Sequence, residues 1–251
     1  MTGKAFFIDT TLCTGCRGCQ IACKQWNQLP ATETENWGSF QNPKDLSFST
    51  YKLVRFEEHL GADDKPVWYF FPDQCRHCVE PPCKEVADES APGGILIDPT
   101  TGAVLYTDKL RKADAEDIVS ACPFDIPRAQ QQTGYMAKCT MCVDRVRNGL
   151  LPACVKTCPT GAMSFGDRDK MVELAKNRLA EVKTRHAKAQ VTGLDDLRVF
   201  YLLIDEPDRY HMFADAHSGP ARMDRKMALR RIGRSLKELS AEWRAVHGLV
   251  G

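Results

Sequence analysis

The chain has 251 residues, of which 43% are hydrophobic and 27% are charged, and its formal net charge is +1. Both fractions are typical of soluble proteins, and the length allows one large domain or two small ones. No apolar run is long enough to cross a bilayer, and no basic patch interleaved with aromatic residues suggests a nucleic-acid partner. The unusual feature is the twelve cysteines, which all lie between Cys13 and Cys158.

The N-terminal segment is predicted to form a strand up to Asp9 that leads directly into the first cysteine motif, and it contains no signal-peptide hydrophobic region. Cys13, Cys16, Cys19 and Cys23 are separated by gaps of two, two and three residues. This 2-2-3 pattern is typical of [4Fe–4S] ferredoxins, in which the fourth cysteine binds a second cluster. The three-residue gap adds about one helical turn and directs that thiolate toward the neighbouring cluster.

Residues 29–72 form a connector in which Tyr51–Glu57 and Val67–Phe71 have strand-like patterns around a turn at 61–66, so a β-hairpin is expected. Ile95–Asp98 and Ala103–Tyr106 flank a Pro-Thr-Thr-Gly turn and predict a second hairpin.

The middle of the chain carries one complete set of four cysteines and one set of vacancies. The complete set is Cys75, Cys78, Cys83 and Cys122. Against the ferredoxin template, all four ligand positions of a sibling cluster lack cysteine, and they are occupied by Ala87, Lys112, Ala115 and Ile118. We therefore expect an ancestral plan of four clusters, of which this chain keeps three. The alanines and Ile118 are expected to fill the vacated pocket, and Lys112 to reach solvent.

The last cysteine motif mirrors the first and ends in Cys158-Pro159, a proline placement that bacterial ferredoxins share. If the last cysteine of each of these two motifs binds the cluster of the other motif, the cysteines assign two more clusters. The first is expected to be held by Cys13, Cys16, Cys19 and Cys158. The second is expected to be held by Cys23, Cys139, Cys142 and Cys154.

After the cysteines, the pattern predicts a helix over Asp167–Lys188 that is capped by Asp167, and a strand over Leu197–Ile204. The apolar face of this helix is formed by Met171, Leu174, Ala175, Leu179 and Val182. A final helix carries an apolar stripe from Leu229 to Val246 among many basic residues. This helix either docks on its own domain or contacts a partner subunit.

These elements predict an α+β fold of two ferredoxin-like modules, one inserted in the other, with small β-hairpins. Residues 1–28 and 133–166 would form the first module, with two [4Fe–4S] clusters. Residues 29–132 would form the inserted module, with one [4Fe–4S] cluster and one lost site. Residues 167–251 would form a mostly helical C-terminal extension.

Other chemistry remains open at the cysteines. Paired Cys-x2-Cys knuckles also bind structural zinc, an even cysteine count allows disulfides, and a hybrid could hold two cubanes with zinc or nothing at the Cys75 set. His77 is expected to hydrogen-bond or pack, and Trp26 to lie in the core. Lys24 and Arg17 either stabilise a reduced cluster or are solvated surface charges.

The cysteine plan resembles the iron–sulfur (beta) subunit of molybdenum- or tungsten-pterin oxidoreductases, over about residues 4–205. The three-cluster count is most similar to the small subunit of formate dehydrogenases from sulfate-reducing bacteria. Cys13–Trp26, Cys75–Cys83 and Leu151–Gly161 carry this likeness.

The resemblance implies a chain without a catalytic site, which relays electrons through three [4Fe–4S] clusters. A large partner subunit would hold the Mo/W-bis-pterin, and a multihaem cytochrome c or a hydrogenase would be the external redox partner. The alternatives are a subunit of a reductase for a sulfur or arsenic oxyanion or an N- or S-oxide, and a stand-alone polyferredoxin. We expect no transmembrane anchor and a periplasmic location reached with a signal-bearing partner; the alternative location is cytoplasmic.

Overall fold

A four-stranded sheet joins the N-terminus to segments that follow the last cysteine by up to 45 residues. Strand β1 (Lys4–Asp9) lies inside the sheet order β8-β1-β10-β9. It pairs antiparallel with β8 (Met163–Asp167) and parallel with β10 (Val199–Leu203). Strand β9 (Gln190–Thr192) completes the sheet by antiparallel pairing with β10.

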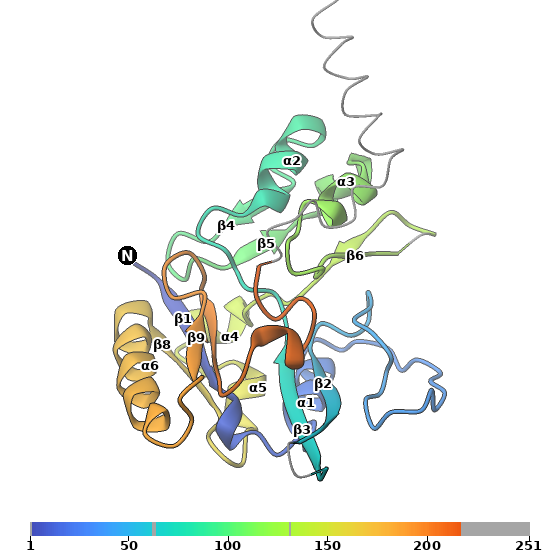
Figure 1. Ribbon diagram of the computed structural model, residues 1–251. Helices are drawn as coiled ribbons and strands as arrows, with labels where there is room; N and C mark the ends of the chain where they lie inside the picture. Colours follow the sequence, from blue (N-terminus) through green and yellow to red (C-terminus); the bar gives the residue numbers. More distant parts are fainter. Residues whose placement is uncertain (1, 62–63, 131, 217–251) are drawn as a thin grey trace, which may run out of the picture. The chain divides into compact units, whose positions relative to one another are not determined.

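The computed structural model describes residues 2–61, 64–130 and 132–216 (Figure 1). The predicted basic helix between Leu229 and Val246 lies outside the described residues. The predicted first strand and the strand near Leu197–Ile204 are confirmed by β1 and β10. The described part of the C-terminal region holds one long helix and two strands, and those strands belong to the sheet of β1.

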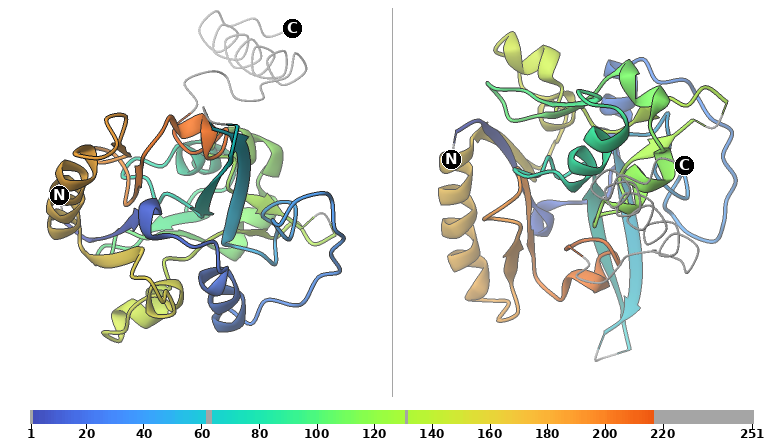
Figure 2. Two further views of the ribbon diagram at one scale, coloured as in Figure 1. Left: turned by 60° about the horizontal axis from the view of Figure 1, so that its bottom comes forward. Right: turned by 90° about the horizontal axis from the view of Figure 1, so that it is seen from above.

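Strand β1 is buried on both faces because successive side chains of a strand point in opposite directions. Phe6 and Ile8 belong to one hydrophobic cluster, whereas Ala5 and Phe7 belong to another. The second cluster is covered by helix α6 (Arg168–Lys183), which packs along one face of the sheet (Figure 2).

Helix α6 differs from its prediction at both ends. It stops at Lys183, five residues earlier than expected. Asp167 occupies the N-cap position, but its carboxylate makes no capping hydrogen bond and pairs instead with Lys4 at 2.6 Å. Ala175 and Val182 are fully buried as predicted, whereas Leu174 is 40% exposed, so the buried stripe is narrower than the periodicity indicates.

Both predicted hairpins are confirmed. Strands β2 (Leu53–Leu60) and β3 (Pro66–Asp73) pair antiparallel along their whole length. Strands β4 (Ile95–Ile97) and β5 (Val104–Tyr106) form the shorter hairpin. A third antiparallel pair, which the sequence did not predict, joins two short strands: β6 (Arg128–Ala129) and β7 (Met136–Ala137).

Several short helices contain or follow the cysteines, and three 3-10 turns complete the described elements. The α-helices are α1 (Gly18–Trp26), α2 (Pro82–Ser90), α3 (Ala115–Ser120), α4 (Val143–Arg147) and α5 (Ala153–Lys156). The 3-10 turns are η1 (Thr10–Leu12), η2 (Asp108–Lys112) and η3 (Pro207–Arg209).

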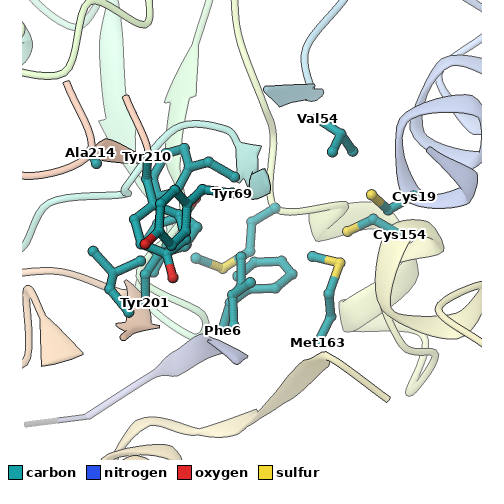
Figure 3. Packing of buried hydrophobic residues seen from close by; sticks show 14 of the residues in the cluster. Phe6, Cys19, Val54, Tyr69, Cys154, Met163, Tyr201, Tyr210 and Ala214 are labelled. Carbon is teal, nitrogen blue, oxygen red and sulfur yellow. The ribbon is translucent and has the colours of Figure 1, made fainter. Parts of the chain in front are cut away.

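The main hydrophobic core runs from the sheet to two of the cysteine helices. Figure 3 shows Phe6 between the aromatic side chains of Tyr69 and Tyr201 on one side and the thiols of Cys19 and Cys154 on the other. Cys19 projects from α1 and Cys154 from α5. The sheet core therefore continues into the cysteine region and fixes these two helices relative to β1.

A buried ion-pair network joins the end of β3 to the chain near residue 213. The carboxylate of Asp73 accepts hydrogen bonds from Arg76 at 2.8 Å and from Arg55 at 2.9 Å. Arg76 is fully buried, and its guanidinium also donates to the carbonyl of Phe213 at 3.1 Å and lies over the Tyr201 ring. These contacts anchor the loop that begins the second cysteine set.

Candidate metal centres

All twelve cysteines lie within the described residues, and every one is a free thiol. The disulfide alternative is therefore not seen in the structure. Cys16 is the exposed member, whereas the others are buried or half-buried. Buried cysteines are usually explained by a disulfide or by packing of single thiols in a core. A set of several unpaired, mostly buried thiols is therefore unusual unless it binds metal.

Three of the four Cys-x2-Cys loops share one backbone feature. In the loops that end at Cys16, Cys78 and Cys142, the residue just before the second cysteine has a left-handed conformation: φ is 66° at Gly15, 46° at His77 and 60° at Met141. Only the first of these is a glycine, and there a Cβ would lie 3.0 Å from the Phe70 ring. Non-glycine residues keep such a conformation only where the surroundings enforce it, which is common at functional sites.

This turn aims backbone N–H groups at sulfur. The N–H of His77 donates to Cys75 Sγ at 3.4 Å, and the N–H of Met141 donates to Cys139 Sγ at 3.4 Å. Gly18 is less crowded: it begins α1, and a Cβ added there would have Cys16 Sγ, at 3.6 Å, as its nearest neighbour. Amide dipoles that point at a thiolate stabilise its negative charge.

The first predicted ligand set gathers where η1 and α1 meet the chain after α5. Burial raises the pKa of Cys13 to about 11, and the nearby thiols of Cys19 and Cys158 add to this effect. The pKa of Cys19 is raised by burial and by the thiols of Cys158 and Cys16. The pKa of Cys158 is lowered: burial opposes this, but hydrogen bonds from Thr160 and from backbone amides outweigh it.

The second predicted set gathers around Cys23, one turn farther along α1. Burial raises the pKa of Cys23 well above its ordinary value, and the next largest causes are the thiols of Cys139, Cys154 and Cys142. The structure thus brings a thiol from α1 together with thiols from the loop before α4 and from α5, which lie more than 100 residues farther along the chain.

The third predicted set surrounds a small cavity. Burial raises the pKa of Cys78, and the thiols of Cys75, Cys122 and Cys83 raise it further. All four cysteines line this cavity, together with Arg76 and Lys138. The four thiols of this set therefore lie around one cavity even though their spacing in the sequence is irregular.

The donor chemistry fits a cationic iron–sulfur core. Raised thiol pKa values mean that several thiolates could not share each site unless a positive charge accompanied them. Irons supply that charge, and four cysteines are the usual ligands of one [4Fe–4S] cluster. Within residues 2–61, 64–130 and 132–216, no three Cys, His, Asp or Glu side chains converge closely enough to hold a single metal ion.

The predicted vacant site is filled by a hydrophobic cluster. Ala87 on α2 and Ile118 on α3 are both 0% exposed, and they belong to the same cluster as Leu110 and Met136. Lys112 is exposed, as expected from the cost of burying its charge. Three of the four positions where the ferredoxin template would place cluster ligands are thus occupied by packed side chains, since Ala115 is partly buried against the same cluster.

The predictions for residues next to the cysteines are only partly confirmed. His77 is fully buried, and its Nδ1 accepts a hydrogen bond from the Val104 N–H at 3.0 Å, as expected. Trp26 is 43% exposed and bonds Asp144, so its prediction as a core residue was wrong. Lys24 is half-buried and donates to the Ser49 carbonyl at 2.8 Å, and Arg17 donates to the Phe40 carbonyl at 3.0 Å.

Two buried lysines lie among the cysteine sets, and no sequence pattern singled them out. Lys52 is 1% exposed and Lys138 is 5% exposed. Lys138 directly precedes Cys139, so its adjacency to a ligand was a usable signal. Lys52 lies just before β2 with no cysteine near it in sequence, and only the fold brings it to the thiols.

In the part of the chain that the structure covers, no helix combines the length and the apolar composition needed to cross a membrane.

Comparison with known proteins agrees with the cysteine chemistry. Residues 66–168 match the 4Fe-4S dicluster domain family. The formate dehydrogenase subunit beta of Megalodesulfovibrio gigas is 53% identical over 214 residues, which cover 85% of this chain and 99% of the relative. The formate dehydrogenase 2 subunit beta (cytochrome c-553) of Nitratidesulfovibrio vulgaris is 52% identical over 84% of this chain and 98% of the relative.

A more distant relative shows the same kind of subunit. The formate dehydrogenase-O iron-sulfur subunit of Escherichia coli is 39% identical over 213 residues, which cover 82% of this chain and 69% of the relative. Identity at these levels over most of each chain extends well beyond the cysteine motifs. The chain belongs to the family of formate dehydrogenase beta, or iron–sulfur, subunits, and its role is that of an electron-transfer subunit.

Proposed function

We propose that this chain relays electrons through three [4Fe–4S] clusters between a molybdenum- or tungsten-pterin catalytic subunit and an external redox partner. The observation that carries the proposal is the gathering of the twelve thiols into three groups of four. Each group combines cysteines from distant parts of the chain. A cubane needs one thiolate on each of its four irons, so three groups match three clusters.

The ligand sets follow from these groups. Site one would be held by Cys13, Cys16, Cys19 and Cys158. Site two would be held by Cys23, Cys139, Cys142 and Cys154. Site three would be held by Cys75, Cys78, Cys83 and Cys122. In the same proposal, residues 1–28 and 133–166 form one ferredoxin-like module, and residues 29–132 form the other.

The sites would lie in the order one, two, three. The Cys154 thiol of site two interacts with Cys19 of site one, and the Cys139 thiol of site two interacts with Cys75 of site three. Site two would therefore connect the outer pair, and exposed Cys16 would bring site one to the surface.

When bound, each cluster supplies a one-electron redox centre. The chain's own residues hold the thiolates, exclude water from them and direct N–H groups at sulfur. Because the hydrophobic cluster of Ala87 and Ile118 occupies the fourth position, we propose that this position holds no cluster.

The catalytic partner is proposed to oxidise formate or to reduce carbon dioxide, and the substrate chemistry would belong to that partner. The names of the relatives at 52–53% identity support this choice. One of those names includes cytochrome c-553, which supports a c-type cytochrome as the external acceptor and a periplasmic location. A hydrogenase is the second candidate acceptor.

The test is metal analysis of the complex purified without oxygen. We expect about twelve irons and about twelve sulfides to be attributable to this chain, beyond those of the catalytic subunit. Reduction should produce the EPR signals of interacting [4Fe–4S] clusters. A zinc content that replaces four of the irons would favour the hybrid alternative. Elution of this chain from gel filtration as a lone protein, without a pterin subunit, would contradict the subunit proposal.

A further inference from the structure

Lys52 lies at the boundary between the first and second cysteine sets. Its side chain is buried, and its ammonium donates to Gln74 Oε1 at 2.5 Å and to the Pro72 carbonyl at 3.4 Å. Burial opposes the charged form, but the thiols of Cys19, Cys154 and Cys139 and the hydroxyl of Tyr201 together outweigh it and raise the pKa of Lys52 above its ordinary value. Cys19 belongs to site one, whereas Cys154 and Cys139 belong to site two.

The charge of Lys52 acts on thiols of both sets. Its charge acts to lower the pKa of Cys13 and Cys19 in site one. It acts in the same direction on Cys23, Cys142 and Cys154 in site two. A single buried ammonium thus lies within electrostatic reach of both sets.

Lys138 occupies the corresponding position between sites two and three. Its ammonium donates to the carbonyls of Val104 at 2.5 Å and Cys139 at 3.0 Å, and it lies 4.7 Å from the centre of the Tyr106 ring. Its charge acts to lower the pKa of Cys139 in site two and of Cys83 in site three. Lys138 also lines the cavity of site three.

Among the described residues, neither lysine has an acidic partner. The hydrogen-bond acceptors of both ammonium groups are neutral carbonyl or amide oxygens, and no described carboxylate lies within ion-pair distance of them. A buried charge without an opposite charge is strongly unfavourable. Two buried arginines, Arg55 and Arg76, pair with Asp73, whereas Arg168 and Arg198 donate to backbone carbonyls. Lys52 and Lys138 differ from all four arginines because cysteine sets surround them, and a cluster bound there would supply the negative charge that no described carboxylate supplies.

We propose that Lys52 and Lys138 are the fixed counter-charges of the cluster relay, one in each gap between neighbouring clusters. A cubane with four thiolate ligands carries roughly two net negative charges when oxidised, and reduction adds one more. A permanent positive charge in each gap stabilises the reduced form of both adjacent clusters. It also weakens the repulsion between neighbouring reduced clusters. This inference rests on the proposed three-cluster function.

The test uses the intact complex, purified without oxygen, with redox titration monitored by EPR. Lys52→Met removes the charge and keeps a long, unbranched side chain. We expect the midpoints of two cluster transitions, those of sites one and two, to fall. At the potential where the unchanged complex is half-reduced, the ratio of reduced to oxidised cluster should fall at least tenfold, which corresponds to about 59 mV for a one-electron couple.

Lys138→Met should also lower two transitions, those of sites two and three. The site-two transition should therefore shift in both variants. The site-three transition should stay nearly unchanged in Lys52→Met, and the site-one transition should stay nearly unchanged in Lys138→Met. Lys52→Arg keeps the charge and should restore most of the lost potential. Lys24→Met is the matched control, because Lys24 follows ligand Cys23 directly but is only half-buried. Water screens its charge, so this variant should produce a clearly smaller shift.

The outcomes separate the inference from the function on which it rests. If the unchanged complex lacks three cluster transitions from this chain, the proposed function fails. If it has them and both methionine variants keep their iron and their midpoints, only the counter-charge inference fails. Should Lys52→Met lose iron, Lys52→Gln, which can still hydrogen-bond Gln74, and Lys138→Met carry the test with the same expected pattern. Equal shifts of all three transitions in both variants would also contradict the inference.

Discussion

Cys19 and Cys23 lie one helical turn apart on α1, and their thiols face different groups of cysteines. The neighbours of Cys19 include Cys158 and Cys16, whereas those of Cys23 are Cys139, Cys154 and Cys142. A short helix of nine residues thus joins two candidate metal centres. Its position is fixed by packing of Cys19 and its neighbours against the sheet core.

This relationship predicts different losses for two nearly adjacent substitutions. Cys19→Ser should remove the site-one cluster and Cys23→Ser the site-two cluster, because each removes one of four iron ligands. Each variant should lose about four irons per chain, and a different EPR transition should disappear in each case. Loss of the same transition in both variants, measured with the same titration, would show that α1 serves one cluster only.

The packed fourth position predicts a stability effect instead of a redox effect. Ile118→Ala should lower the free energy of unfolding by about 2–5 kcal/mol, because it opens a cavity in a fully buried cluster. The iron content and the cluster potentials should stay unchanged. The thermal midpoint of the anaerobic protein measures the effect, and Ile21→Ala, at a side chain that is 59% exposed, is the control. A loss of iron from Ile118→Ala would mean that this position contributes to a metal site.

The network around Asp73 predicts a larger effect. Asp73→Asn removes the negative charge shared by two buried guanidinium groups, those of Arg55 and Arg76. Breaking a buried ion pair in this way costs about 3–5 kcal/mol. We expect a correspondingly lower thermal midpoint, and an earlier loss of site three on heating because Arg76 lies between Cys75 and His77. The exposed pair of Lys4 and Asp167 provides the control, and Asp167→Asn should change stability much less, because water screens a surface ion pair. Equal effects of the two substitutions would contradict this account.

His211 predicts how stability depends on pH. Burial lowers its pKa from the ordinary 6.5 to about 4, against the opposing attraction of Asp73. Between these values the unfolded chain binds a proton that the folded chain does not. His211 therefore favours folding fully above about pH 6.5, and this contribution is lost as the pH falls toward about 4.

The measurement is the thermal midpoint between about pH 7.5 and about pH 5. His211→Leu should reduce the fall in midpoint that the unchanged protein shows on acidification. Part of the fall should remain, because the pKa of buried His77 is lowered as well. A leucine at exposed His186 should leave the fall as it is. An undiminished pH dependence in the His211 variant would show that this histidine is not held neutral.

Local patterns in the sequence predicted much of this structure. Each hairpin depends on a turn and on two adjacent strands, and both were found where alternation and turn residues placed them. The vacancies at Ala87 and Ile118 were visible because the ferredoxin spacing is rigid enough to count along. Their burial in one apolar cluster agrees with the pattern.

Features that depend on distant parts of the chain were not predictable in the same way. The parallel pairing of Phe6 with Val199 spans almost the whole described chain, and periodicity carries no information about partners. Trp26 was expected in the core because it is large and apolar, but α1 turns it toward Asp144 at the surface. Lys52 has the pattern of a surface lysine, and only the assembled core buries it beside two cysteine sets.

The most direct test of the account is diffraction from anaerobic crystals of the complex at the iron absorption edge. The account predicts three iron–sulfur positions in this chain. They should be bound by the cysteine groups of Cys19, Cys23 and Cys78, with the Cys23 cluster between the other two. A fourth iron–sulfur position between Ala87 and Ile118, or a cluster that takes both Cys19 and Cys23 as ligands, would contradict it.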